Sequence, residues 1–301
     1  MKEGIFMNQS KIGLFISLNR KKQNITQEQL AEKLGVSINA VSKWERGLNL
    51  PDASLMQKLC NVLNISLSEL FDGEYKNLEI KNLYKIYETK QEKIVAIDNA
   101  NYKFEMGKLY AIMGHSGSGK TTLLNILGTL DKQTSGKYLI NDTEISNFSE
   151  EQLSYIRMKK IGFIFQNYQL DHNLKAFENV MLPMYINNEI KRNERKIKSL
   201  KLLDFVGLKD RYNHYPKELS GGEQQRVAIA RSLANEPNII IADEPTGNLD
   251  EKNEKLIFEI LNKLKNDGKC VIIVTHDKSI LKYADNILYM SKGKLGVYNE
   301  E

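Results

Sequence analysis

The sequence predicts two domains of different class, a small all-α bundle followed by a larger α/β domain, and three observations support this. Residues 1–72 show short helical patterns, capping residues and glycine turns, without an alternating strand pattern. From Leu78 onward, apolar runs of strand length alternate with longer helical patterns, as in α/β domains. A polar stretch with one glycine, residues 72–77, lies between them, so we place the domains at residues 1–74 and 75–301.

The composition is that of a globular chain. Of its 301 residues 41% are hydrophobic and 27% charged, and only 5 are proline, which excludes disordered and collagen-like classes. The apolar runs are far shorter than the roughly 20 residues that span a bilayer, and the first residues do not resemble a signal peptide. Two distant cysteines, Cys60 and Cys270, favour a reducing cytoplasm. The net charge of +5 favours no particular class of partner.

The N-terminal region contains the signals of two short helices joined by a tight turn. Thr26 with Gln29 three residues later is a capping-box pattern, Gly35 ends that helix, and Ser37 can cap a second one that runs to about residue 46. This is the helix-turn-helix arrangement. The second helix carries small and polar residues that can reach base edges in a major groove, namely Asn39, Ala40, Ser42 and Lys43.

On these residues, the chain resembles the Cro/C1-type (XRE-family) helix-turn-helix domain, a five-helix bundle, over about residues 9–72. The resemblance implies that Gln27 binds a DNA phosphate and that Arg20 and Glu45 form an internal ion pair. The implied base-reading residues are Ser37, Asn39, Ala40, Ser42 and Lys43. It also implies binding as a dimer to a palindromic or repeated site.

The charge of this domain leaves an alternative open. Residues 1–74 contain nine basic and eight acidic residues, a net charge of only +1. That is weak attraction for a phosphate backbone, because such binding rests on the release of counterions by Lys and Arg. A protein-docking module is therefore the alternative to a DNA reader.

A strand-like run, a glycine-rich loop and a helical run follow one another at residues 108–127. The loop has the pattern G-x-x-x-x-G-K-T, which in this context predicts a P-loop nucleotidase fold. Its backbone N–H groups can close around phosphate oxygens, and the helix N-terminus adds its positive end. We expect Lys120 to reach the β- and γ-phosphates, Thr121 to ligate Mg²⁺, and Thr122 to contact the α-phosphate. The expected nucleotide-binding residues here are Gly114, Ser116, Gly117, Ser118, Gly119, Lys120, Thr121 and Thr122.

Two further motifs extend this site. The apolar run at residues 239–242 delivers Asp243 and Glu244 to the carboxyl end of a buried strand, where α/β sheets bind ligands. We expect Asp243 to hold the Mg²⁺ shell and Glu244 to orient and deprotonate the attacking water. Residues 220–223, Ser-Gly-Gly-Glu, open a helix and form a second amide-lined anion site. Because one protomer has no second γ-phosphate, this turn is expected to complete the site of a partner.

With these motifs in this order, residues 78–296 resemble the ATP-binding subunit of ABC transporters, which implies an α/β P-loop ATPase with a helical subdomain that uses ATP and Mg²⁺. The resemblance implies that Tyr87 stacks on adenine, with Tyr84 as the alternative. Gln166 would contact Mg²⁺ and water and sense a permease, and His276 would contact the γ-phosphate. The implied second nucleotide-binding face comprises Ser220, Gly221, Gly222, Glu223 and Asp250.

The stretches FQNYQLDHNLKAFENVMLPMYI and ADEPTGNLD narrow the resemblance to lipoprotein-releasing, macrolide-exporting and antimicrobial-peptide-resistance transporters. It implies a head-to-tail homodimer at the inner face of the cell membrane that drives a separate or fused permease. Because this sequence has no apolar run long enough to span a bilayer, we expect the permease on another chain. The segment after Gln166, with Phe177 and Pro183, is the expected docking surface. A fused DNA-binding domain would tie this activity to transcription. The alternative is a soluble transcriptional regulator whose DNA binding is gated by ATP-dependent dimerisation.

Overall fold

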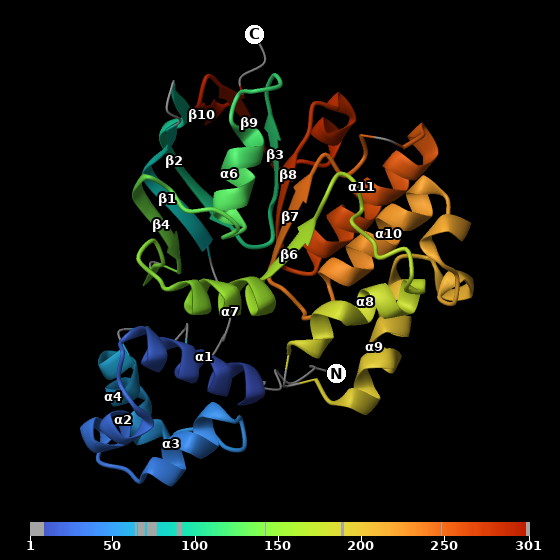
Figure 1. Cartoon of the computed structure of the whole chain (residues 1–301). Helices are drawn as coiled ribbons and strands as arrows, with labels where there is room; N and C mark the ends of the chain where they lie inside the picture. The colour runs from blue at the N-terminus through green and yellow to red at the C-terminus, as the bar shows by residue number, and fades with distance from the viewer. Residues whose placement is uncertain are drawn as a thin grey trace. The chain divides into compact units, whose positions relative to one another are not determined.

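The structure is a computed structural model that describes residues 9–63, 65, 70, 77–88, 92–141, 143–187, 190–247 and 249–298. The chain divides into two compact units, Met1–Tyr75 and Lys76–Glu301. The first is all-helical and the second is mixed α/β (Figure 1), so the predicted fold class is confirmed for both. No helix in these described ranges has the length and apolar character needed to cross a membrane.

The small unit is built from four described helices, α1 (Gln9–Lys22), α2 (Gln27–Leu34), α3 (Ile38–Glu45) and α4 (Ala53–Leu63). The fifth helix expected from the sequence falls between residues 64 and 76, where the structure describes only Ile65 and Leu70. The helices enclose one apolar core that includes Ile16, Leu30, Val41, Trp44 and Leu59. Each such side chain contributes about 1.5–3 kcal/mol when fully buried, and this is what holds short helices together that would not form alone.

The helix-turn-helix pair forms as the capping residues predict. Thr26 caps α2 and accepts from the backbone N–H of Gln29, whose side chain accepts from the Thr26 N–H in return. Gly35 ends the helix at φ 74°, a left-handed conformation that glycine adopts without a Cβ penalty. Ser37 then caps α3 by accepting from the Ala40 N–H.

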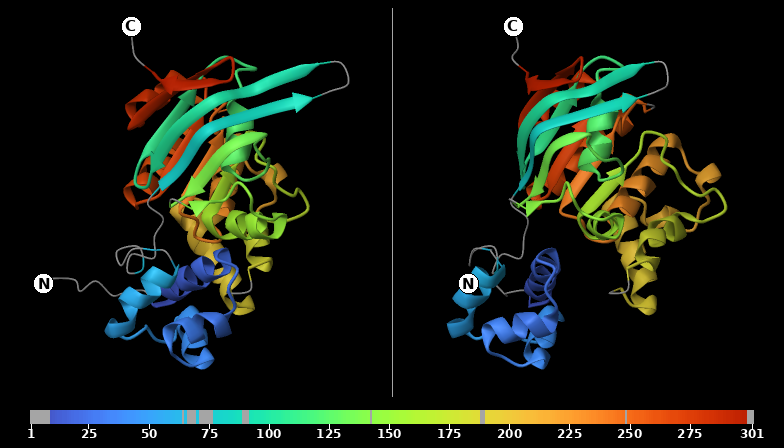
Figure 2. Two further views of the ribbon diagram at one scale, coloured as in Figure 1. Left: turned by 90° about the vertical axis from the view of Figure 1, so that its left-hand side faces the viewer. Right: turned by 60° about the vertical axis from the view of Figure 1, so that its left-hand side comes forward.

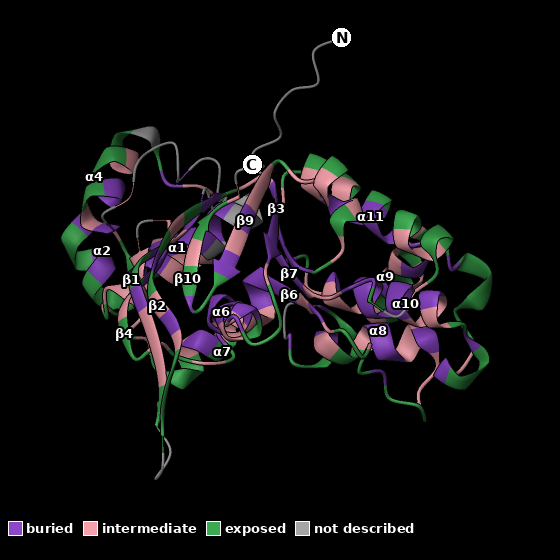
Figure 3. Ribbon diagram, turned by 90° about the horizontal axis from the view of Figure 1, so that it is seen from above, coloured by how far each residue is buried: buried purple, intermediate pink, exposed green. Residues whose placement is uncertain are grey.

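The large unit is centred on a six-stranded sheet of order β10-β9-β3-β8-β7-β6. Its strands are β10 (Lys294–Val297), β9 (Asn286–Ser291), β3 (Leu109–Met113), β8 (Cys270–Val274), β7 (Ile239–Asp243) and β6 (Ile161–Ile164). All neighbours are parallel except the β10–β9 pair. Strands β3 and β8 are buried throughout, as Figure 3 shows for β3, and this explains their unbroken apolar sequences.

A second sheet is antiparallel, with the order β2-β1-β4-β5. It consists of β2 (Lys93–Glu105), β1 (Asn77–Glu88), β4 (Ser135–Ile140) and β5 (Thr143–Glu144). Figure 2 shows β1 and β2 as long strands that run side by side. Register shifts between Ile80 and Ile86 bend this pair, which carries Tyr87 near its end.

Helices cover the sheets and form a group of their own. They are α6 (Lys120–Leu127), α7 (Glu150–Lys160), α8 (Ala176–Tyr185), α9 (Arg192–Phe205), α10 (Gly221–Ser232) and α11 (Glu251–Asn266), with short 3-10 turns η1 (Lys209–Arg211), η2 (Pro216–Glu218) and η3 (Lys278–Lys282). Helices α8, α9 and α10 gather beyond the edge strand β6 (Figure 1), which is the helical subdomain expected from the sequence.

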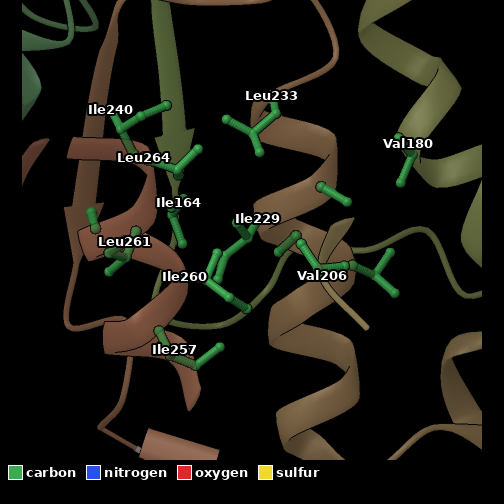
Figure 4. Packing of buried hydrophobic residues seen from close by; sticks show 14 of the residues in the cluster. Ile164, Val180, Val206, Ile229, Leu233, Ile240, Ile257, Ile260, Leu261 and Leu264 are labelled. Carbon is green, nitrogen blue, oxygen red and sulfur yellow. The ribbon is translucent and has the colours of Figure 1, made fainter. Parts of the chain in front are cut away.

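One apolar core joins this helical group to the sheet. Ile229 and Leu233 of α10 face Ile164 of β6 and the side chains of α11 (Figure 4). The apolar residues of α11 recur with helical spacing, at Ile257, Phe258, Ile260, Leu261 and Leu264, and all are buried. The charged residues 191–196 lie largely in the first turns of α9 and are mostly exposed, and the neighbouring Ile197 is 58% exposed.

Candidate functional site

The loop between β3 and α6 has a backbone that only glycine can supply at two positions. Gly114 has φ 148° and Gly119 has φ 104°. A Cβ at Gly114 would lie 2.2 Å from the Met290 carbonyl oxygen, and one at Gly119 would lie 2.2 Å from that of Ala96. Any side chain would therefore push the loop away from β9 and β2. The glycines fix the curvature that lets successive N–H groups face one ligand.

Lys120, the first residue of α6, is held at this loop. Its Nζ donates to the carbonyl oxygens of Gly114 at 2.8 Å and His115 at 2.9 Å, and the residue is only 9% exposed. Ser118 is also buried, and its hydroxyl has no hydrogen-bond partner in the described part of the chain. His115, Ser116 and Gly117 are exposed at the tip of the loop. The loop thus offers an ammonium group and several N–H groups to an anion.

Asp243 lies at the carboxyl end of β7 and faces the start of α6. Burial and the neighbouring charge of Glu244 raise the pKa of Asp243 above its ordinary value of 3.8, although the Lys120 charge and a hydrogen bond with the Thr121 side chain act in the opposite direction. A carboxylate whose charge is costly in this way favours a nearby cation. The hydroxyl of Thr121 and the carboxylate of Asp243 are therefore adjacent, as the sequence predicts for a metal site.

The donor set fits Mg²⁺ better than a metal that binds side chains alone. Within the described ranges, no three His, Cys, Asp or Glu residues form a cluster that could hold a metal ion. A hydroxyl, a carboxylate and an amide oxygen are hard oxygen ligands, which suit Mg²⁺ when a substrate phosphate completes the shell. Thr121 and Asp243 provide two of these, and Gln166 could provide the third.

Glu244 and His276 form the most direct polar contact of the site. The His276 Nδ1 lies 3.0 Å from Glu244 Oε1 and 2.9 Å from Oε2, although the two residues are 32 positions apart. Glu244 adopts φ 45°, a costly conformation for a non-glycine residue, and its N–H donates to the Val274 carbonyl at 2.9 Å. Strain of this kind persists where the surroundings hold a functional side chain in place. The sequence motifs on β7 and after β8 therefore meet.

Gln166 follows β6 and reaches the same end of the sheet. Its Nε2 lies 3.6 Å from the position that a Cβ on Gly247 would occupy, and the Glu244 carbonyl oxygen lies at the same distance from that point. The side chain is therefore beside the loop that carries Glu244. Thr121, Asp243, Glu244, His276 and Gln166 come from different elements and end at one edge of the parallel sheet, which is where open α/β sheets bind ligands.

Tyr87 is the aromatic residue that reaches the P-loop helix. Its hydroxyl donates to Asp131 Oδ2 at 2.8 Å and also interacts with the Thr122 side chain. Tyr84, the alternative, pairs instead with Ser135 of β4. The Tyr87 ring is 39% exposed, so one face is available for stacking on a base.

Sequence reasoning missed the two residues that hold this ring. Lys85 Nζ lies 4.8 Å from the centroid of the Tyr87 ring and donates to Asp131 Oδ1 at 2.7 Å. Burial pushes the pKa of Asp131 up, but the bonds from Lys85, Tyr87 and the Lys132 N–H outweigh it and hold the pKa below 3.8. Lys85 and Tyr87 are two apart on one strand, so the alternation of β1 could have placed them together.

The second anion-binding turn forms the start of α10. Ser220 caps this helix by accepting from the Glu223 N–H at 3.3 Å, and Glu223 accepts from the Ser220 N–H at 2.8 Å. Gly221 and Gly222 leave the first turn without bulky side chains. No hydrogen bond or ion pair joins residues 220–223 to residues 114–122 in the described structure, and α6 and α10 lie on either side of β6 and β7 (Figures 1 and 3).

Asp250 has a structural task of its own. It caps α11 by accepting from the Asn253 N–H at 2.8 Å and from the Asn253 side chain, and the same two interactions lower the pKa of Asp250. Asn253 in turn accepts from Arg226 of α10. Asn248, which belongs to the same stretch ADEPTGNLD as Asp250, lies outside the described residues.

The candidate DNA-binding residues lie along one short helix. Ser37, Asn39 and Lys43 are exposed, whereas Ser42 is half-buried and Ala40 packs against the bundle core. The predicted ion pair is present: Arg20 Nε lies 2.5 Å from Glu45 Oε1, and Nη2 lies 3.1 Å from Oε2. Gln27 Nε2 donates to Glu45 Oε2 at 2.7 Å, which uses one of its two N–H groups and leaves the other for a phosphate.

Comparison with protein families gives two matches on this chain. A family model described as ABC transporter matches residues 97–247, which is half of the chain. A second model, described as helix-turn-helix, matches residues 16–70. The two matches fall on the two compact units.

Two relatives each match somewhat less than three quarters of this chain. An ABC transporter ATP-binding protein of Methanocaldococcus jannaschii, MJ1508, is 48% identical over 218 residues, which cover 72% of this chain and 97% of that protein. The macrolide export ATP-binding/permease protein MacB of Bdellovibrio bacteriovorus is 45% identical over 216 residues, again 72% of this chain but 33% of the relative. This chain therefore matches one third of a protein whose name includes a permease.

A solved structure supports the same comparison. The dimeric post-hydrolysis state of the ATP-binding cassette MJ0796, bound to ADP and Pi, is 42% identical and superposes with a TM-score of 0.68. The similarity covers 74% of this chain and 97% of that one.

Proposed function

The chain belongs to the ABC transporter family and is an ATP hydrolase, and on that premise we propose that it drives a separate membrane permease from the cytoplasmic face of the membrane. In this proposal two copies bind two ATP molecules between them. Residues 114–122 of one copy and residues 220–223 of the other enclose each nucleotide. The bundle of the first unit is a sequence-specific DNA reader carried on the same chain.

One observation carries the proposal most directly. Glu244 and His276 are in contact at the edge of the sheet where the P-loop begins, while a second amide-lined turn in the same chain has no such partners. A site that has a general base and a P-loop but lacks a second cluster of backbone N–H donors is completed by the turn of another copy. The dimeric cassette to which this chain is similar supports that reading.

The residues divide the work of hydrolysis. Glu244 is placed to accept a proton from the attacking water, and the His276 Nδ1 contacts its carboxylate. With both ring nitrogens protonated, His276 would donate from Nδ1 to Glu244 and from Nε2 to the γ-phosphate. Lys120 exchanges its bonds to loop carbonyls for phosphate oxygens. Thr121, Asp243 and Gln166 are the residues that would hold Mg²⁺, which supplies charge neutralisation on the phosphate oxygens when bound.

A groove in the large unit provides the docking surface for a permease. Its volume is about 300 Å³ and it lies between β6, α7, α8 and α10. Its lining includes Phe163, Phe165, Gln169, Pro183 and Arg231. Pro183 therefore belongs to this surface, whereas Phe177 does not line it and packs its ring against Tyr212 and Lys196. The lining combines aromatic and apolar side chains with polar and charged ones, including Arg157 and Asn235, which suits a short amphipathic helix of a partner.

The transporter proposal has a direct test. The chain is co-expressed with the multi-spanning permease encoded by a neighbouring reading frame, and ATP hydrolysis is measured after reconstitution in liposomes. We expect the two proteins to co-purify and the permease to change the ATPase rate. Failure to associate with any membrane protein would overturn transport and favour a regulator gated by ATP-dependent dimerisation.

The DNA-binding part of the proposal rests on the exposed face of α3. Ser37, Asn39 and Lys43 are accessible there, at the part of a helix-turn-helix that enters the major groove. Ser42 and Ala40 lie closer to the core, and Gln27 would have to share its amide between Glu45 and a phosphate. Selection of binding sequences from a random duplex library at low salt tests this. No enrichment would make the bundle a protein-docking module.

A further inference from the structure

The loop that follows Gln166 contains a backbone arrangement that needs outside support. Tyr168 has φ 55° and Gln169 has φ 51°, so two consecutive residues with side chains adopt the left-handed conformation. Each is unfavourable for an L-residue, and neither is a glycine or an asparagine that visits this region readily. Such a pair persists only where neighbouring groups hold it.

Arg231, near the end of α10, supplies that support. Its Nη2 donates to the Tyr168 carbonyl oxygen at 2.6 Å and its Nη1 donates to the Gln169 carbonyl oxygen at 2.5 Å. The two bonds come from one planar guanidinium, which holds both carbonyls in a fixed mutual orientation. Arg231 therefore fastens the loop to the C-terminal half of α10.

The ring of Tyr168 fastens the same loop to the other end of α10. Its hydroxyl oxygen lies 3.0 Å from the position that a Cβ on Gly221 would occupy, and its Cζ lies 3.9 Å from it. Leu249 Cδ2 lies 3.8 Å from the same point. The ring is half-buried against the helical core and lies beside Gly221, the first residue of α10 and the middle residue of the Ser-Gly-Gly turn.

We propose that Arg231 and Tyr168 form a clasp that joins the loop after Gln166 to α10, so that this loop and the turn at residues 220–223 move as one rigid piece. Both are positioning residues for ATP hydrolysis: they touch no nucleotide in their own copy, but they set where the turn meets a partner's γ-phosphate. The inference rests on the proposed two-copy site.

The clasp also lies at the permease groove. Arg231 and Gln169 both line that groove, so an occupant would contact the guanidinium or the loop it holds. Helix α10 thus joins the groove to the Ser-Gly-Gly turn. Arg231 holds the loop at the groove end of this helix, and the Tyr168 ring contacts the turn at its other end. A shift imposed at Gln169 would be carried to Gly221 through rigid elements that have few alternative packings.

ATP-dependent dimerisation of the full chain tests the clasp. Glu244→Gln serves as the parent, because it is expected to hold ATP without hydrolysing it, and dimerisation is followed by analytical ultracentrifugation. We expect Arg231→Met in this parent to raise the ATP concentration needed for half-dimerisation at least tenfold. The affinity of the monomer for a fluorescent ATP analogue should stay within twofold, because the P-loop is untouched. Arg192→Met, at an exposed arginine of α9, is the matched control.

A suppressor pair tests the contact at Gly221. Gly221→Ala places a methyl group 3.0 Å from the Tyr168 hydroxyl, and Tyr168→Phe removes that oxygen and leaves the nearest ring carbon at 3.9 Å. We expect Tyr168→Phe to restore part of the dimerisation that Gly221→Ala loses. A general loss of packing would instead make the double variant worse than either single one.

The outcomes separate the clasp from the proposal on which it rests. If the Glu244→Gln parent does not dimerise with ATP, the two-copy site is wrong and the clasp falls with it. If the parent dimerises and Arg231→Met does so at the same ATP concentration, the clasp alone is overturned. Should Arg231→Met fail to fold, Tyr168→Ala, which removes one half-buried ring, makes the same comparison with the same two readings.

Discussion

The nucleotide site and the face of α3 differ in how their side chains are held. Around the P-loop, positive-φ glycines, a strained Glu244 and a partly buried Asp243 fix the geometry before any ligand arrives. On α3, Asn39 and Lys43 are exposed side chains, and no hydrogen bond or ion pair from the described part of the chain orients them. The first region is preorganised for one chemistry, whereas the second offers a scaffold on which several ligands could be recognised.

This difference explains why the two regions reveal their roles unequally. Phosphate binding and water activation require particular residue types at fixed positions, so a sequence that meets them points to one reaction. Recognition by exposed side chains depends on which partner provides the complementary groups, and the helix-turn-helix fold places few constraints on it. The following experiments test whether the contrast holds.

The largest effect should come from the preorganised site. Replacing Glu244 with Gln removes the general base while keeping its shape, so we expect ATP turnover to fall by about 10²–10⁴-fold with ATP binding retained. Turnover is measured by phosphate release and binding by a fluorescent analogue. Glu259→Gln, at an exposed glutamate of α11, is the control and should hydrolyse ATP normally. Unchanged turnover in Glu244→Gln would remove this residue as the base.

The next effect concerns the stability of the scaffold. Arg20→Met leaves Glu45 buried without its partner, and breaking a buried ion pair costs about 3–5 kcal/mol. The chain contains a single tryptophan, Trp44, which is buried in the bundle, so its fluorescence reports the unfolding of this unit alone. We expect a clear loss of stability in urea, with ATP turnover preserved.

Arg46→Met is the matched control for that experiment, because Arg46 is an exposed arginine of the same bundle. Its urea transition should stay close to that of the parent chain. A parallel loss of ATP turnover in Arg20→Met would contradict the view that the bundle and the ATP site depend on separate sets of contacts.

Much of the nucleotide site could be predicted from the sequence because its signals are local. The loop 114–121 needs glycine for backbone reasons, and Asp243 follows a run of apolar residues that can only be a buried strand. The contacts that could not be predicted are long-range: Asp131 under Tyr87, and Arg231 on the carbonyls of Tyr168 and Gln169. They join segments 44 and 63 residues apart, and no periodicity marks such pairs.

In the bundle, the capping residues were sufficient to predict the helices but not the contacts between side chains of different helices. Thr26, Gln29, Gly35 and Ser37 act as their spacing predicts, since each satisfies a backbone group of its own helix. The hydrogen bond from the Gln27 side chain to Glu45 could not be predicted in this way, because Glu45 lies on another helix.

A medium effect is expected at the DNA-reading face. Asn39→Ala removes a side-chain amide that can form two hydrogen bonds with an adenine. Such a bidentate pair contributes about 1–3 kcal/mol of discrimination against the wrong base. Binding to a selected duplex should weaken about tenfold and become less sequence-selective in a shift assay, whereas Lys43→Ala should weaken binding to all sequences and reduce its salt dependence. Asn61→Ala on α4 is the control. Equal binding by Asn39→Ala and the parent would break the assignment of α3 as the reading helix.

The smallest effect should appear in the stability of the large unit with pH. Because the pKa of Asp243 is raised by burial and by Glu244, its ionisation lowers the stability of the ligand-free fold as pH rises from the ordinary value of 3.8 through the raised value. Asp243→Asn removes this charge, so its melting temperature should exceed that of the parent chain slightly at neutral pH. The difference should vanish when the pH falls well below 3.8, where the aspartate is protonated in both states. Asp210→Asn, at an exposed carboxylate, is the control. A lower melting temperature for Asp243→Asn at neutral pH would contradict this prediction. It would mean that the interactions of Asp243 with Thr121 and Lys120 stabilise the fold more than burial and repulsion from Glu244 destabilise it.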